Sequence, residues 1–180
     1  MARPMDPLRL KSLRNKIRPH QAEPGDLYLV VSIEEQRLFV CRGESVVDEY
    51  PCSSSRFGTG SRENSLKTPL GIHRIIEKYG ADAPPGRVFR DREDTGEDWD
   101  HSQNGDNLIL TRILRLEGLE EGINRGPGID SYERYIYIHG SPETAEMGKP
   151  GSIGCIRMRN AEIVELFDLV PPYTPVEIRG

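Results

Sequence analysis

From residue 26 onward, the chain consists largely of short segments rich in β-forming residues and separated by turn residues. Segments of this length suit the strands of an antiparallel sheet and leave little room for helices. We therefore predict a mainly β fold with one or two short helices, with strands at residues 27–33, 37–41, 45–50, 70–78, 107–116 and 174–178. No internal repeat indicates a solenoid or a propeller.

The segment 1–25 is basic and has a helical pattern. Its first 20 residues carry six Lys or Arg side chains and one acid, so its net charge is plus five. Asp6 suits a helix N-cap and Pro7 suits the first helical position. An apolar stripe follows at helical spacing: Leu10, Leu13 and Ile17. We expect a short helix docked on the main domain, 26–180. A nucleic-acid-binding arm is the alternative, but no aromatic residues are interleaved for base stacking.

A second helix is predicted near the C-terminus. Asn160 suits its N-cap, and the helix would run over 161–169 until Pro171 and Pro172 stop it. One face of this helix is apolar: Ile163, Phe167 and Val170.

The stretch 79–106 is too long and too polar for a simple turn. It is rich in Asp and Glu, and Trp99 within it offers an apolar contact for a substrate. We expect an acidic loop or lid, whose charge would suit a ligand with an ammonium group. A flexible insertion without function is the alternative.

The composition is that of an ordinary globular protein: 180 residues, 36% hydrophobic, 29% charged, with a net charge of −5. The longest apolar run, residues 27–31, is too short to span a membrane. The N-terminal residues show neither the apolar core nor the cleavage site of a secretory signal. If Met1 is the natural start, a cytoplasmic location is expected; otherwise a periplasmic one remains the alternative.

The cysteines and histidines show no metal-binding pattern. Cys41, Cys52 and Cys155 lack CxxC spacing, and the histidines at 20, 73, 101 and 139 lack the spacing of zinc motifs. Cys41 and Cys52 lie in one hairpin but out of register for a disulfide. We expect no disulfide between them, no metal and no cofactor.

The residues that carry chemistry gather between 137 and 158. Ile136 and Ile138 alternate with Tyr137 and His139, so His139 leaves a strand on its polar face. A histidine at this position can act as a base for a nucleophile that a following loop supplies.

Cys155 is that candidate nucleophile, since a thiolate attacks when a base or a positive potential lowers its pKa. Gly154 lets the backbone turn, so that the N–H groups of Gly154 and Cys155 can point at a developing oxyanion. Arg157 adds a fixed positive charge. Ser152 either hydrogen-bonds a substrate or closes the turn. For a lone cysteine a buried, inert thiol is the default, and His139 with Gly140 shifts that balance.

These residues resemble the L,D-transpeptidase catalytic domain, also called the YkuD domain. The chain has His-Gly at the end of a strand, then Ser152, Gly154, Cys155, Ile156 and Arg157, as in the family's signature. Two earlier segments are also similar: Tyr50-Pro51-Cys52-Ser53 and Lys67-Thr68-Pro69-Leu70-Gly71. The resemblance covers roughly residues 26–178 and implies an antiparallel β-sandwich or barrel-like domain.

The resemblance implies acyl transfer on peptidoglycan stem peptides. Cys155 would attack the carbonyl that precedes a terminal D-Ala, and His139 would act as general base and then as acid. The Gly140 carbonyl would orient the imidazole in place of a carboxylate. Gly154 and Cys155 would form the oxyanion hole. Carbapenems, which acylate the cysteine in this family, would acylate Cys155. The substrate contacts expected are Tyr137, Ser152, Ile153 and Arg157.

Ile153 departs from the family pattern, which most often has a second histidine there. An isoleucine cannot donate a hydrogen bond, although it can line an apolar wall, so altered activity is expected rather than its loss. Arg157 either anchors a substrate carboxylate or forms a structural ion pair.

The acceptor of the acyl group separates the remaining alternatives. Without an export signal, hydrolysis is the first expectation: an L,D-carboxypeptidase that trims tetrapeptide muropeptides during cytoplasmic peptidoglycan recycling. The alternatives are an envelope L,D-transpeptidase that forms crosslinks or exchanges D-amino acids, and a non-catalytic peptidoglycan-binding module. Neither a nucleic-acid partner nor a membrane span is expected.

Overall fold

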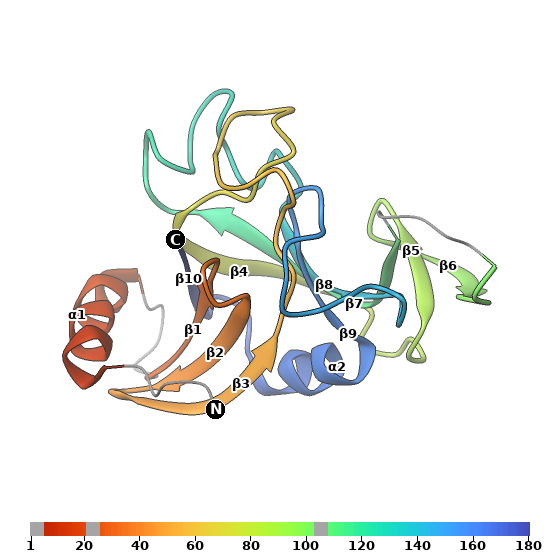
Figure 1. Cartoon of the computed structure of the whole chain (residues 1–180), viewed down its shortest axis with the longest axis horizontal. Coiled ribbons are helices and arrows are strands. Elements are labelled where there is room, and N and C mark those ends of the chain that lie inside the picture. The colour runs from red at the N-terminus through yellow and green to blue at the C-terminus, as the bar shows by residue number, and fades with distance from the viewer. Residues whose placement is uncertain (1–5, 21–25, 103–107) are drawn as a thin grey trace.

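The computed structural model describes residues 6–20, 26–102 and 108–180. Within these ranges, strands form one strongly curled sheet, with a helix at each of two faces (Figure 1). The helices are α1 (Pro7–Ile17), which continues into a 3-10 turn (Arg18–His20), and α2 (Asn160–Leu169). The strands are β1 (Leu27–Ser32), β2 (Arg37–Arg42), β3 (Ser45–Pro51), β4 (Gly71–Tyr79), β5 (Arg87–Arg90), β6 (Glu93–Asp98), β7 (Ile109–Gly118), β8 (Tyr137–Ser141), β9 (Ile156–Arg159) and β10 (Pro175–Arg179).

The order of strands along the sheet is β3-β2-β1-β10-β4-β7-β5-β6, while β8 pairs with β7, and β9 with β8. The pairs β1–β10 and β8–β9 are parallel, and the other pairs are antiparallel. The prediction of a mainly antiparallel β fold with one or two short helices is therefore confirmed, and the described residues form two. The predicted start of one strand at residue 107 lies outside the described residues.

Strands β1 and β2 are buried on both faces because successive side chains point to opposite sides of the sheet. One face packs into the main core, which also receives Ile163, Leu166 and Phe167 of α2. Its contributions from the two strands are Leu29, Val31, Leu38 and Val40. The intervening residues form a second cluster beneath α1: Tyr28, Val30, Phe39 and Cys41. The alternation thus builds two apolar layers from one pair of strands.

Helix α1 is the docked helix that the sequence pattern indicates. The Asp6 carboxylate accepts a hydrogen bond from the Leu8 N–H at 3.0 Å, and a proline follows the cap. Its apolar stripe is buried in the second cluster: Leu10, Leu13 and Ile17. Each such buried side chain contributes about 1.5–3 kcal/mol. Lys16 Nζ also lies 3.1 Å from the buried Glu177 carboxylate.

Helix α2 begins one residue earlier than predicted. Arg159 occupies the N-cap position without a side-chain cap, and Asn160 is the first helical residue. The Asn160 side chain instead accepts a hydrogen bond from the Thr111 hydroxyl at 2.7 Å. The predicted N-cap role is wrong because a tertiary partner on β7 holds the amide that a cap would use.

The prediction of a loop over 79–106 is wrong for β5 and β6, which form a hairpin within it. Val88 pairs with Leu110 on β7, and Phe89 is buried with Ile113 and Tyr137. This long-range pairing gives a polar, acidic stretch a strand conformation that its local composition does not favour. Residues 103–107, which the same prediction included, lie outside the described ranges.

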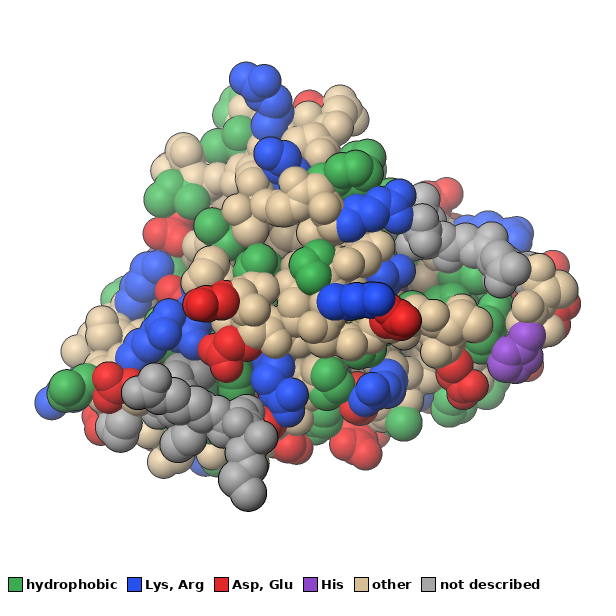
Figure 2. All heavy atoms as spheres, viewed as in Figure 1, with side chains coloured by type: hydrophobic (Ala, Val, Ile, Leu, Met, Phe, Trp, Pro, Cys, Tyr) green, Lys and Arg blue, Asp and Glu red, His purple; other side chains and the backbone are tan. Residues whose placement is uncertain are grey.

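Surface charge is mixed over the face shown in Figure 2. Lys and Arg side chains alternate with Asp and Glu side chains, and among the described residues on this face there is no continuous basic stripe. None of the helices in the described part of the chain is long and apolar enough to cross a membrane.

His73 and His139 are buried, and their burial lowers the pKa of each from 6.5 to about 4. The unfolded chain therefore binds more protons than the folded chain between pH 6.5 and 4. Folded-state stability that is fully present above pH 6.5 is lost as the pH falls towards 4.

We expect the free energy of unfolding, measured by urea titration, to fall steadily as the pH is lowered from 7 to 4.5 because both histidines are buried. His73→Asn should make this pH dependence shallower. His101→Gln, a change at an exposed position, should leave it unchanged. An equal slope in the wild type and in the His73 variant would show that His73 does not contribute.

Candidate active site

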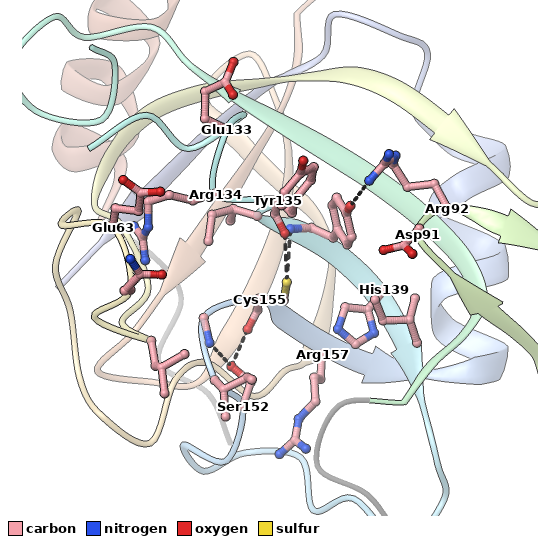
Figure 3. Close-up of a pocket in the computed structure, with 17 residues that line it drawn as sticks. Glu63, Asp91, Arg92, Glu133, Arg134, Tyr135, His139, Ser152, Cys155 and Arg157 are labelled. Carbon is pink, nitrogen blue, oxygen red and sulfur yellow. Dashed lines mark hydrogen bonds between the residues drawn. The ribbon is translucent and has the colours of Figure 1, made fainter. Parts of the chain in front are cut away.

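A pocket of about 460 Å³ lies beside β8, the segment that leads into β9, and the turn between β5 and β6 (Figure 3). It brings together most of the residues that the sequence singled out: Tyr137, His139, Ser152, Ile153, Gly154, Cys155 and Arg157. Gly140 does not line the pocket but lies directly behind His139. Trp99, expected to contact a substrate, is not among the lining residues; its ring packs against that of His101 at a tilt of 44°.

The parallel pairing of β8 with β9 explains this convergence. His139 is in register with Arg157, and Ile138 with Ile156, so that Cys155 comes to lie at the start of β9 beside the histidine strand. Ile138 and Ile156 are anchored in the main core. Apolar packing on the opposite face of these strands thus fixes two candidate reactive groups that lie 16 positions apart in the chain.

The Cys155 sulfur is held by two backbone groups. The Tyr137 N–H donates to Sγ at 3.3 Å, and the thiol donates to the Tyr135 carbonyl at 3.4 Å. Tyr135 adopts the left-handed conformation at φ 55°, which is uncommon for a residue other than glycine and aims its carbonyl at the sulfur. Burial raises the pKa of the Cys155 thiol to about 11, against a smaller lowering by the Tyr137 N–H and by Arg134.

The His139 imidazole is fixed by its neighbour in the chain. Nδ1 lies 2.6 Å from the Gly140 carbonyl oxygen, and because a carbonyl only accepts, Nδ1 carries the proton. Burial, with a smaller contribution from the Arg157 charge, lowers the pKa of His139 to about 4 against the opposing effect of that hydrogen bond. At neutral pH the ring is therefore uncharged, with Nε2 unprotonated.

The raised pKa of Cys155 and the lowered pKa of His139 favour a neutral thiol and a neutral imidazole over a thiolate–imidazolium ion pair. Among the described residues, the hydrogen-bond partners of Sγ are the two backbone groups, and none links it to His139. A general base can be loosely placed before substrate enters and tighten afterwards. Both side chains line the same pocket.

The turn before Cys155 is closed by Ser152. Its hydroxyl donates to the Cys155 carbonyl at 2.5 Å and accepts from the Gly154 N–H at 3.2 Å. The Gly154 N–H predicted to face an oxyanion is therefore already paired. The Tyr137 N–H, which already points at Sγ, is the backbone donor that the sequence did not indicate. Of the two roles considered for Ser152, the structure shows the one that closes the turn.

Gly154 needs glycine because its φ of 140° lies in a region that other residues rarely adopt. Its carbonyl accepts from the Thr68 hydroxyl at 2.9 Å, and the same oxygen of Thr68 accepts from the Ser55 N–H at 3.0 Å. Thr68, from the Thr-Pro motif in the first half of the sequence, thus holds in place the segment that carries Cys155.

Arg157 is buried, and its Nη2 lies 3.2 Å from the Ser53 hydroxyl, while the two residues also exchange backbone hydrogen bonds. Its charge acts on His139 rather than on the thiol. The cation that lowers the pKa of Cys155 is Arg134, which sequence reasoning missed. Arg134 donates to the carbonyls of Gly60 and Lys67. The signal for it in the sequence was its place directly before Tyr135, three residues ahead of β8.

The rest of the pocket wall mixes apolar and charged groups. Ile153 lines it, as the sequence suggested. The Tyr137 hydroxyl accepts from Arg92 at 3.2 Å, and Arg92 also lies 5.1 Å from the Tyr135 ring centroid. Arg92 is at the turn of the β5–β6 hairpin, so this hairpin reaches the site. Glu63, Asp91 and Glu133 add carboxylates at the rim.

The remaining cysteines take no part in the site. Cys41 and Cys52 are free and buried, and burial raises the pKa of each to about 12. Cys41 pairs in register with Val46 rather than with Cys52. Within the described residues, no group of His, Cys, Asp and Glu side chains is arranged to hold a metal ion.

Comparison with known proteins agrees with this architecture. The family model "YkuD: L,D-transpeptidase catalytic domain" matches residues 26–178, and the chain therefore belongs to this family. The YkuD protein of Bacillus subtilis (strain 168) is 49% identical over 46 residues, which cover 26% of this chain and 28% of that protein. A protein named chaperone DnaJ from Nitratidesulfovibrio vulgaris is 30% identical over 95 residues, or 53% of this chain and 25% of that protein.

Among solved structures, an L,D-transpeptidase fragment from Xylanimonas cellulosilytica superposes with a TM-score of 0.52 at 18% identity. The match covers 90% of this chain and 64% of that one. At this identity the likeness shows the fold. The chain spans less than half the length of the curated relatives that it matches.

We expect alkylation of the native protein by iodoacetamide to be confined to Cys155 and to accelerate steeply between pH 8 and 11, because burial raises the pKa of this thiol. Arg134→Gln should slow the reaction at a given pH, and Arg134→Lys, which keeps the charge, should not. Peptide mass spectrometry locates the label. Half-maximal reactivity below pH 8 would show a preformed thiolate instead.

Proposed function

We propose that this chain carries out cysteine-dependent acyl transfer at the L,D-peptide bond of peptidoglycan stem peptides. One observation carries the proposal: Cys155 and an imidazole oriented by the Gly140 carbonyl converge on one pocket. This arrangement occurs in a chain of the L,D-transpeptidase catalytic domain family. The carbonyl does the work that a carboxylate does in other triads, because it fixes the tautomer and the ring orientation.

In the proposed first step, Sγ attacks the carbonyl carbon that precedes a terminal D-Ala, and His139 Nε2 takes the thiol proton. The carbonyl π electrons move to oxygen, which receives hydrogen bonds from backbone donors such as the Tyr137 and Cys155 N–H groups. The carbon–nitrogen bond then breaks, and the nitrogen leaves with the proton that His139 returns. The product is a Cys155 thioester and free D-Ala.

The charges around the pocket suit a zwitterionic peptide. Three arginines line it (Arg92, Arg134 and Arg157), as do three carboxylates (Glu63, Asp91 and Glu133). A stem peptide carries carboxylates and, on its third residue, an amino group. The arginines of the pocket can therefore pair with the carboxylates of the peptide, and the carboxylates of the pocket with its amino group. Of these cations, Arg157 remains our choice for a carboxylate anchor because it lies in register with His139.

For the acceptor we propose water, which makes the reaction that of an L,D-carboxypeptidase. Cys155 is partly exposed, so water can reach a thioester there. In the cytoplasm this reaction would trim tetrapeptide muropeptides during peptidoglycan recycling. An amine acceptor would instead give an L,D-transpeptidase product.

Acylation by imipenem tests the nucleophile and the base. Intact-mass spectrometry should show one adduct on the wild type and none on Cys155→Ala. His139→Ala should slow its formation about 100-fold or more, because general-base catalysis is lost. Cys52→Ala is the matched cysteine control and should react as the wild type does. Binding of stem peptides without adduct or turnover would instead indicate a binding module.

Product analysis tests the acceptor. Incubation with a purified disaccharide tetrapeptide should release D-Ala and disaccharide tripeptide in equal amounts, since water resolves the thioester. Cys155→Ala should release neither. If dimers or D-amino-acid exchange products form and no tripeptide appears, the hydrolytic part of the proposal is wrong while acyl transfer stands.

A further inference from the structure

Strand β7 carries a bulge directly opposite the His139–Gly140 step. Leu110 pairs with Gly140 and Ile113 pairs with His139, so Thr111 and Arg112 are extra residues on β7. Bulges of this kind bend a strand and re-aim the side chains next to it, and they are frequent beside active sites. The bulge therefore lies at the position where the imidazole leaves the sheet.

Thr111 holds the bulge in a strained conformation. Its φ is 74°, which is exceptional for a β-branched residue, and the residue is fully buried. Such strain costs on the order of 1–3 kcal/mol and persists only where surrounding contacts enforce it. The Thr111 hydroxyl makes those contacts: it accepts from the Gly86 N–H at 2.9 Å and donates to the Asn160 amide oxygen at 2.7 Å. One side chain thus joins β7, the segment before β5, and the start of α2.

The amide of Asn160 packs against Gly140. A Cβ atom placed on Gly140 would lie 2.6 Å from Asn160 Oδ1 and 2.5 Å from the Leu110 carbonyl oxygen, both closer than real Cβ atoms approach. Glycine is required here for close approach, since its φ is not in the left-handed region. The Gly140 carbonyl in turn receives the His139 Nδ1–H. A continuous path of contacts therefore leads from Thr111 through Asn160 and Gly140 to the imidazole.

We propose that Thr111 and Asn160 are positioning residues that hold the Gly140 backbone, and through it the His139 imidazole, in the tautomer and orientation needed for proton transfer. This proposal rests on the acyl-transfer function proposed above. Neither residue touches the pocket; each acts through Gly140.

Loss of the Thr111 hydroxyl has a defined consequence. Thr111→Val keeps the shape but leaves the Gly86 N–H and the Asn160 oxygen without this partner, so the strained bulge loses the bonds that enforce it. Thr111→Ser keeps both bonds. A displacement of the Gly140 carbonyl by about 1 Å is enough to lower a rate by a factor of about 100.

The experiment combines two readouts on the full chain. The first is the imidazole ¹⁵N spectrum of histidine-labelled protein, in which His139→Gln assigns the His139 signals and the wild type should show a single Nδ1–H tautomer. The second is the rate of imipenem acylation. We expect Thr111→Val to mix the tautomers and to slow acylation about 10- to 100-fold, while Thr111→Ser restores both to wild-type values.

A second pair of variants keeps the test decisive if Thr111→Val does not fold, which circular dichroism would show. Asn160→Asp keeps an acceptor oxygen for Thr111 and should retain the single tautomer, whereas Asn160→Leu should lose it. Unchanged His139 signals in the folded Thr111→Val or Asn160→Leu protein would overturn the proposal, even if the rate fell. If the wild type forms no imipenem adduct, the proposed function fails, but the tautomer readout still decides the positioning role.

Discussion

The parallel pairing of β8 with β9 is the constraint on which the rest of the site depends. It sets His139 in register with Arg157 and brings Cys155 to the end of the same pair of strands. Apolar residues on the opposite face, such as Ile138 and Ile156, secure the pairing in the main core. The reactive face can therefore be polar and partly open without loss of geometry, because its stability comes from the other side of the sheet.

Burial then decides the charge states of the reactive groups. Removal from water disfavours both a thiolate at Cys155 and an imidazolium at His139, so the pKa of one rises and that of the other falls. The two shifts together give a neutral thiol beside a neutral base. In the proposed acyl transfer, this state requires the proton to move during attack rather than before it, and it leaves His139 unprotonated over a wide range of pH.

The first half of the chain supports the second. Thr68 braces the Gly154 carbonyl, and Ser53 forms backbone hydrogen bonds with Arg157. These residues belong to the two earlier motifs that resemble the L,D-transpeptidase catalytic domain. Although both motifs lie far from the cysteine in sequence, they form hydrogen bonds with the segment that carries it and hold that segment in place.

The sequence by itself determined most of the strand positions and the docked helix α1, and it singled out the cysteine and histidine that the fold brings to one pocket. These features depend on local patterns: alternation over two residues, helical spacing, caps and short motifs. Only the tertiary structure decided that Arg134 rather than Arg157 acts on the thiol, that the Gly154 N–H is already paired, and that an acidic stretch forms the β5–β6 hairpin. It also placed Thr111 and Asn160 behind Gly140. Desolvation, electric field and close packing depend on which distant segments meet, and no local pattern contains that information.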